Sequence, residues 1–213
     1  MRRIKVWDGP TRLFHWLLVL LIAAAWWTAE EEMLDWHYRI GLAVLILIVF
    51  RLIWGFVGSS TSRFASFVKG PSAIAAYLRG AAPHRVGHNP LGALSVLALL
   101  FMVAAITGLG LISEDEDGIA PGPLAYLVGA DVSEAARELH ELGFNVLLAL
   151  VALHVAAILY YALVRRDNLL GPMLSGSRDL PDGVEPMRAA PLWRAAVALA
   201  AAIGFGWWIW TGA

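Results

Sequence analysis

Residues 140–154, HELGFNVLLALVALH, place two histidines at the ends of an apolar run that carries no charge after Glu141. An α-helix rises about 1.5 Å and turns about 100° per residue, so His140 and His154 lie roughly 21 Å apart and within roughly 40° of one face. Ionisable side chains inside a membrane usually face a helix bundle and meet a partner there. The stretch therefore predicts a membrane-spanning helix with one imidazole near each side of the bilayer.

The composition of the whole chain also indicates a membrane protein. Its 213 residues are 59% hydrophobic and 15% charged, whereas soluble domains contain about 25% charged residues. The ten Trp residues suit the aromatic belts found at membrane interfaces. The chain has no Cys, which excludes disulfides, thiolate-bound iron–sulfur clusters and covalently attached haem. A metal centre in this chain must therefore be held by His, Met or carboxylate side chains.

Five segments are long and apolar enough to cross a bilayer, which takes about 20 mostly apolar residues. They are Leu13–Thr28, Trp36–Val57, Leu91–Ile112, Leu139–Val164 and Leu192–Trp210. The first ends in two Trp and a triple Glu, which favours a span over a cleaved signal peptide. We therefore expect an all-α integral membrane protein. It would consist of a four-helix transmembrane domain over residues 1–166, a cytoplasmic linker over 167–190 and an additional transmembrane helix over 191–213.

Basic and acidic residues alternate from loop to loop. The N-terminal segment, the loop 58–90 and the segment after the fourth span are basic, whereas the segments 30–35 and 114–138 carry eleven acids and one Arg. By the positive-inside rule, we expect a multi-pass protein of a bacterial inner membrane with a cytoplasmic N-terminus and a periplasmic C-terminus.

Two short stretches outside the spans predict local helix structure. GPSAIAAYLRG predicts a short interfacial helix from Pro71, and Asp131 with Glu134 predicts a capping pair that starts the fourth helix well outside the membrane.

Two more histidines match the two depths of the opening stretch. His15 opens the first span on the cytoplasmic side, at about the depth of His154, and His37 opens the second span on the outer side, at the depth of His140. Two facing imidazoles suit the two axial positions of a haem iron, whereas zinc requires three or four ligands around one point. Packing residues or a proton relay are the alternatives. Four histidines in two pairs favour haem.

Four residues near these pairs are candidates for contact with haem. Arg39 and Arg51, near the two ends of the second span, are placed to pair with propionates, with snorkelling to the cytoplasmic surface as the alternative for Arg51. Gly41 and Gly143 follow the two outer histidines within a turn or so. Small residues there would let either a flat macrocycle or a neighbouring helix approach the backbone.

The remaining two histidines, His84 and His88, fall in the basic loop and at its junction with the third span. We interpret them as solvated or headgroup residues. The alternative function is at a quinone site, where His88 would accept a proton.

Four stretches of the chain are similar to the bacterial cytochrome b561 family, which itself resembles the b-type subunits of membrane nickel–iron hydrogenases. They are VWDGPTRLFHW, HYRIGLAVL…RLIWGFVG, GHNPLGALSVLALLFMVAAITG and ELHELGFNVLLALVALHVAAI, over about residues 5–165. The resemblance implies a four-helix transmembrane bundle with two b haems. It assigns His15 and His154 to the cytoplasmic-side haem, and His37 and His140 to the periplasmic-side haem. The fifth span lies outside the pattern.

Members of that family pass electrons between the quinone pool and a partner at the outer surface, and one branch oxidises superoxide and reduces ubiquinone. Acidic outer loops repel superoxide and suit a Lys-rich partner. We therefore expect an electron-transfer protein that connects quinone to a periplasmic redox protein such as a c-type cytochrome, rather than a stand-alone oxidoreductase. We expect membrane lipid around it and no nucleic-acid partner.

Three alternatives remain. They are a superoxide oxidase, the cytochrome b subunit of a larger oxidoreductase such as a hydrogenase, and a haem-free carrier. The carrier is disfavoured because no Asp or Glu lies deeper in a span than Glu141 and no pair of broken helices marks a central site.

Overall fold

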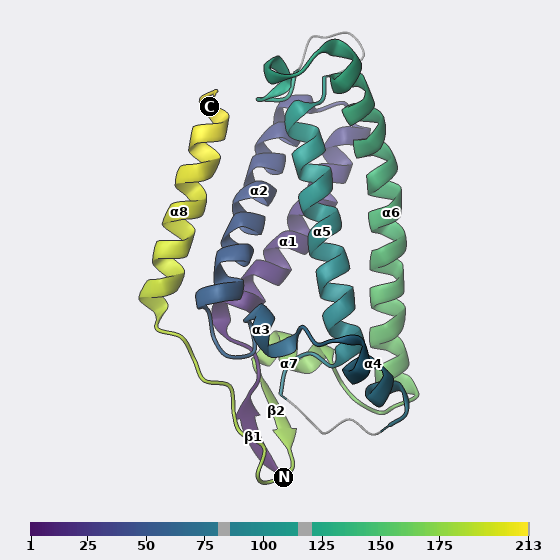
Figure 1. Ribbon diagram of the computed structural model, residues 1–213, viewed down its shortest axis with the longest axis vertical. Helices are drawn as coiled ribbons and strands as arrows, with labels where there is room; N and C mark the ends of the chain where they lie inside the picture. The colour runs from purple at the N-terminus through teal and green to yellow at the C-terminus, as the bar shows by residue number, and fades with distance from the viewer. Residues whose placement is uncertain (81–85, 115–120, 213) are drawn as a thin grey trace. The chain divides into compact units, whose positions relative to one another are not determined.

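Five long helices form the framework of the computed structural model, which describes residues 1–80, 86–114 and 121–212 (Figure 1). Each is long and apolar enough to cross a membrane, so the prediction of an all-α protein with five spans is confirmed. Their bounds are α1 (Gly9–Glu30), α2 (Leu34–Val57), α5 (Pro90–Ile112), α6 (Ala130–Leu163) and α8 (Leu192–Trp210).

The starts of two of these helices are fixed by capping side chains. The Asp8 carboxylate accepts a hydrogen bond from the Thr11 backbone N–H at 2.7 Å, so α1 begins four residues before the predicted span. The Asn89 side-chain oxygen accepts the Gly92 N–H at 2.7 Å in the same way at the start of α5. Each cap satisfies a backbone donor that the first helical turn leaves open.

The fourth span begins far upstream of its apolar run, as predicted, but not at the predicted cap. α6 starts at Ala130 and runs for 34 residues. The Gly129 carbonyl accepts the N–H groups of Val132 and Ser133, so Asp131 lies inside the first turn instead of capping it. The Ser133 hydroxyl donates to the Ile112 carbonyl at 2.9 Å and ties this turn to the last residue of α5.

Short elements lie between the long helices. They are β1 (Arg2–Lys5), α3 (Phe64–Phe67), α4 (Pro71–Leu78), η1 (Ala125–Leu127), α7 (Leu170–Ser175) and β2 (Ser177–Leu180). The helix predicted from Pro71 is confirmed as α4. The strands were not predicted: β1 pairs antiparallel with β2 (Figure 1). The predicted linker 167–190 is therefore ordered over much of its length.

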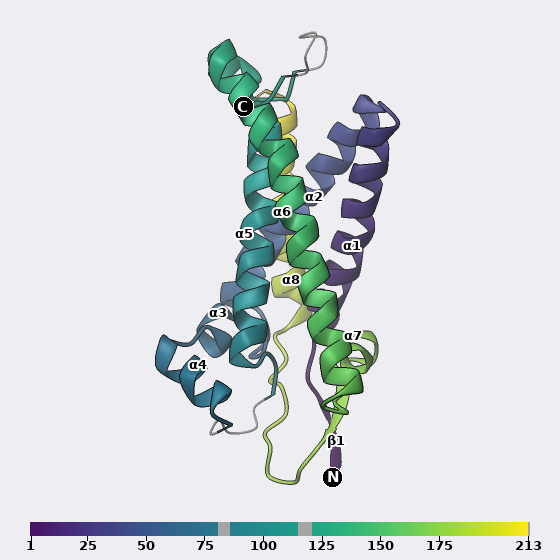
Figure 2. The ribbon, with the colours of Figure 1, turned by 90° about the vertical axis from the view of Figure 1, so that its right-hand side faces the viewer.

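The chain divides into two compact units. Unit 1 comprises residues 1–14, 51–98 and 151–198, and unit 2 comprises residues 15–50, 99–150 and 199–213. The boundary falls within each of the five long helices, and Figure 2 shows α1 and α2 joined by a short turn that belongs to unit 2. Among the described Lys and Arg residues, all except Arg39 and Arg137 belong to unit 1.

Asp8 is the centre of a buried polar network in unit 1. Besides capping α1, its carboxylate accepts hydrogen bonds from the Trp54 indole N–H at 3.2 Å and from the Ser62 hydroxyl at 2.8 Å. The Trp54 side chain is fully buried. Burial raises the pKa of Asp8, but hydrogen bonds from Thr11, Ser59 and Ser62 outweigh it and hold the pKa below its usual value. The network joins the start of α1, the end of α2 and the loop that follows.

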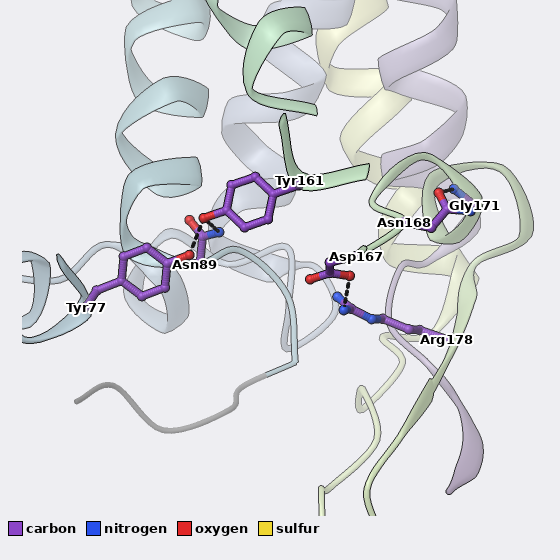
Figure 3. Close-up of polar contacts among 7 residues, drawn as sticks. All are labelled: Tyr77, Asn89, Tyr161, Asp167, Asn168, Gly171 and Arg178. Atoms are coloured by element: carbon purple, nitrogen blue, oxygen red, sulfur yellow. Dashed lines mark hydrogen bonds and ion pairs between the residues drawn. The ribbon is translucent and has the colours of Figure 1, made fainter. Parts of the chain in front are cut away.

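A second polar cluster holds α4 against the end of α6 (Figure 3). The hydroxyls of Tyr77 and Tyr161 hydrogen-bond to each other, and the Asn89 amide donates to the Tyr161 oxygen at 3.2 Å. Burial, with a contribution from the bond to Tyr161, raises the pKa of Tyr77 to about 12. Beyond α6, Asp167 pairs with Arg178 of β2. These contacts fasten the segments around the end of α6 in unit 1.

The fifth long helix packs through small residues. Ala198, Ala202 and Gly206, each one turn after the last, form a buried stripe along α8. A Cβ at Gly206 would lie 2.6 Å from Cγ1 of Ile46 in α2. Small residues at four-residue spacing let two membrane helices approach closely, so the part of α8 that belongs to unit 2 packs on α2 at Gly206.

Candidate functional site

Unit 2 brings the predicted outer pair of histidines together. His37 extends from the first turns of α2 and His140 from α6, with ring centroids 6.0 Å apart and ring planes at 77°. Both side chains are partly buried. The two residues are more than a hundred positions apart in the chain, so helix packing alone creates this pair.

A backbone carbonyl holds each of the two rings by its Nδ1 atom. His37 Nδ1 lies 2.9 Å from the Ala25 carbonyl of α1, and His140 Nδ1 lies 2.8 Å from the Ile106 carbonyl of α5. A carbonyl oxygen only accepts, so Nδ1 carries the proton in both rings. A neutral ring then keeps its lone pair on Nε2. Metal-binding histidines are typically oriented by this kind of hydrogen bond.

The spacing of the two rings fits axial ligation of a single haem iron. An imidazole nitrogen lies about 2 Å from a metal that it binds, so two imidazoles on opposite sides of one iron have ring centres about 6 Å apart. The observed 6.0 Å agrees. Within the described residues, no three His, Asp or Glu side chains gather as a metal site. A pair of imidazoles with no third such group beside it suits a haem iron better than zinc.

A glycine of α5 makes room for the His140 ring. A Cβ at Gly110 would lie 2.9 Å from Cε1 and 3.1 Å from Nδ1 of His140, so any larger residue displaces the imidazole. By contrast, a Cβ at Gly108 would meet no heavy atom within 4 Å. The sequence shows both glycines in the third span but does not show which of them faces the histidine.

The two glycines predicted to contact haem have different surroundings. A Cβ at Gly143 would lie 2.9 Å from Cγ1 of Ile106, so Gly143 serves the close approach of α6 to α5. A Cβ at Gly41 would meet no heavy atom within 4 Å, which leaves the backbone accessible one turn after His37. Gly143 therefore fits the helix-packing alternative, whereas contact between Gly41 and haem remains a prediction.

The predicted inner pair is divided between the two units. His154 belongs to unit 1, where its Nδ1 lies 3.3 Å from the Ser95 hydroxyl of α5. His15 belongs to unit 2, where its ring makes an edge contact with Trp16 at 4.9 Å. The pairing of His15 with His154 therefore remains a prediction.

The two predicted propionate partners differ in burial. Arg51 is only 3% exposed, and its guanidinium lies 5.0 Å from the ring centroid of Phe64. The Asp8 carboxylate attracts this cation, but its Nη1 atom is buried with no hydrogen-bond partner among the described residues, and such an open donor suits a further carboxylate. The burial argues against snorkelling. Arg39 is exposed and stacks over Trp36 at 5.5 Å.

The histidines of the basic loop are placed differently by the structure. His84 lies outside the described residues. His88 stands between the rings of Trp7 and Phe67, with centroids 4.6 and 4.8 Å away. It also lines a cavity of about 630 Å³ whose wall includes Phe67, Arg63 and Arg188. His88 is therefore packed within unit 1 rather than fully solvated.

Comparisons with known proteins agree with these observations. The family model of prokaryotic cytochrome b561 matches residues 6–176. The probable Ni/Fe-hydrogenase 1 B-type cytochrome subunit of Escherichia coli (strain K12) is 24% identical, over 81% of this chain and 89% of the relative. The corresponding subunit of Azotobacter chroococcum mcd 1 is 27% identical, over 84% and 90%.

A relative of a different kind also matches. The probable superoxide oxidase CybB of Yersinia pestis is 27% identical, over 77% of this chain and 93% of the relative. No solved structure matches the chain. The five long apolar helices and the match over most of the chain lead to one conclusion: this multi-pass membrane protein belongs to the prokaryotic cytochrome b561 family of b-type haem proteins.

Proposed function

We propose that this protein binds two b haems and passes electrons between membrane quinone and a redox protein at the outer surface. The single observation that carries the proposal is the pair His37 and His140, whose ring centroids lie 6.0 Å apart and whose Nδ1 atoms are both held by carbonyls, so that both rings could hold one haem iron. Haem iron supplies the reversible one-electron step. The protein supplies ligation, orientation and exclusion of water.

The second haem would be held by His15 and His154. Its propionates would find a partner in Arg51, because a buried guanidinium with an open donor favours a carboxylate. The concentration of basic residues in unit 1 supports a cytoplasmic position for this unit by the positive-inside rule. In this proposal, the outer haem lies near the periplasmic side of a bacterial inner membrane and the inner haem near the cytoplasmic side.

The cavity beside His88 is our proposed site for the quinone headgroup. Its volume of about 630 Å³ lies within the usual range of about 300–1,000 Å³ for small-molecule sites. His88 would exchange a proton with the ring oxygen of the quinone, and the neighbouring Phe67 offers an aromatic face.

The surface charge of unit 2 favours a basic redox protein over superoxide. Glu30, Glu31 and Glu32 are all exposed. Of the two described cations of unit 2, Arg39 is exposed, and Arg137 is compensated by Glu141, with their atoms 3.0 Å apart. An acidic surface speeds encounter with a basic partner and slows encounter with an anion. A c-type cytochrome therefore fits this surface better than superoxide does, although the Yersinia pestis relative bears the name of a superoxide oxidase.

The haem content of histidine variants tests the proposal. We expect purified wild-type protein to contain two b haems per chain by the pyridine haemochrome assay. His37→Ala and His140→Ala should each remove the same haem, and His15→Ala and His154→Ala the other, as judged by redox titration. A wild-type protein without haem, or a His37→Ala protein that keeps both, contradicts the assignment.

The choice of outer partner is tested by kinetics at two ionic strengths. We expect the reduced protein to be oxidised rapidly by a basic ferricytochrome c, and the rate to fall as salt screens the acidic surface. Superoxide should reduce the oxidised protein slowly. Fast reduction by superoxide together with slow exchange with cytochrome c would favour the superoxide oxidase alternative.

A further inference from the structure

We propose that α5, which carries no histidine, is the positioning helix for both histidines of α6. Gly110 and the Ile106 carbonyl would fix His140, and the Ser95 hydroxyl would fix His154. This inference rests on the proposed ligation of haem by these histidines. It adds that α5, which ligates neither iron, sets the reduction potential of each haem through a separate contact.

The outer contact is defined by sterics and by a hydrogen bond. The Ile106 carbonyl lies 2.8 Å from His140 Nδ1. Gly110, one turn further along α5, lies so close that a Cβ would come within 2.9 Å of the imidazole. The glycine therefore allows the ring to reach the carbonyl, and the carbonyl selects the tautomer that leaves Nε2 for iron.

The inner contact uses a side chain instead of the backbone. Ser95 Oγ lies 3.3 Å from His154 Nδ1, and both side chains are partly buried. The hydroxyl is the acceptor when His154 binds iron through Nε2, because Nδ1 then carries the proton. α5 thus contacts α6 at Ser95 in unit 1 and at Ile106 in unit 2.

The two acceptors should give the two haems different properties. A hydrogen bond from Nδ1–H makes an imidazole a stronger electron donor to its metal, which favours the ferric state and lowers the reduction potential. Removing the acceptor should therefore raise the potential. The Ser95 hydroxyl is removable by substitution, whereas the Ile106 carbonyl is part of the backbone and is reached only through Gly110.

Redox titration of a Ser95→Ala protein tests the inner contact. We expect the reduction constant of one haem to rise by up to about tenfold, the upper end for loss of one hydrogen bond, which is about 59 mV for one electron. The haem affected should be the one that His154→Ala removes. Ser95→Thr, which keeps the hydroxyl, should restore the wild-type potential. Thr107→Val, which removes an α5 hydroxyl bonded to its own helix, should change neither potential.

A Gly110→Ala protein tests the outer contact. We expect loss of the haem that His140→Ala removes, or a shift in its potential, while the other haem keeps its wild-type potential and thereby reports a folded bundle. Gly108→Ala is the matched control, since its surroundings are open. Unchanged potentials and haem content in either Ser95→Ala or Gly110→Ala would overturn the inference, because it assigns a positioning role to α5 at both histidines. A wild-type protein without haem would instead overturn the proposed function.

Discussion

Replacing Asp8 by Ala should destabilise the protein through the polar network of unit 1. The change removes the cap of α1, which contributes about 1 kcal/mol. It also leaves the indole N–H of the fully buried Trp54 without its acceptor, which costs about 1–3 kcal/mol. The Ser62 hydroxyl keeps a partner in Thr11, 2.8 Å away, so it adds little. The sum is roughly 2–4 kcal/mol of unfolding free energy.

Thermal unfolding in detergent measures this effect. For a chain of this size, roughly 2–4 kcal/mol lowers Tm by about 5–15 °C. Asp182→Ala is the control, because Asp182 is 82% exposed. The pKa of Asp8 is depressed in the folded protein, so its contribution is fully present above the unfolded pKa of about 3.9. It is lost as pH falls through the lower folded pKa. Equal Tm values for the two variants at pH 7 would refute the reasoning.

Two further predictions concern α8 and Arg51. Gly206→Val should drive a side chain into Ile46 and lower the unfolding free energy by about 1–3 kcal/mol. Gly204→Val is the control, because the surroundings of Gly204 are open. Equal Tm values for the two variants would contradict the packing of α8 on α2. Arg51→Gln should lower the potential of one haem by roughly 40 mV, since the lost attraction to the added electron is on the order of 1 kcal/mol. Lys69→Gln, a substitution at an exposed residue, is its control, and an unchanged potential in redox titration would contradict the proposed role of Arg51.

Much of the fold follows from the sequence because apolar length dictates where a chain can cross a bilayer. The last span was predicted without error as Leu192–Trp210. The start of α1 lies outside the predicted span because the apolar run begins only at Leu13, although the Asp8 in WDGPT is a capping signal. The strands were missed for a different reason: RRIK and SRDL have no apolar alternation, and their pairing joins segments more than 170 positions apart.

The candidate site was predictable only at the level of residue type and depth. Helix geometry indicated that His37 and His140 share a level, and the structure brings them together. The groups that orient His37 and His140 could not be predicted from the sequence, because both are backbone carbonyls. The sequence around Ser95 does not distinguish it from other serines in membrane spans, and only helix packing places it beside His154.

The pairing of β1 with β2 has a consequence for biosynthesis. Residues 2–5 leave the ribosome long before residues 177–180, to which they bond, and the Lys5 carbonyl accepts the N–H of Met187. Residues 2–5 therefore cannot form these bonds until α1, α2, α5 and α6 have been synthesised. Before then their backbone groups bond to water and are open to proteases. Closure of this small sheet requires synthesis as far as residue 180, so nascent proteins arrested before residue 177 should be cleaved preferentially near Lys5.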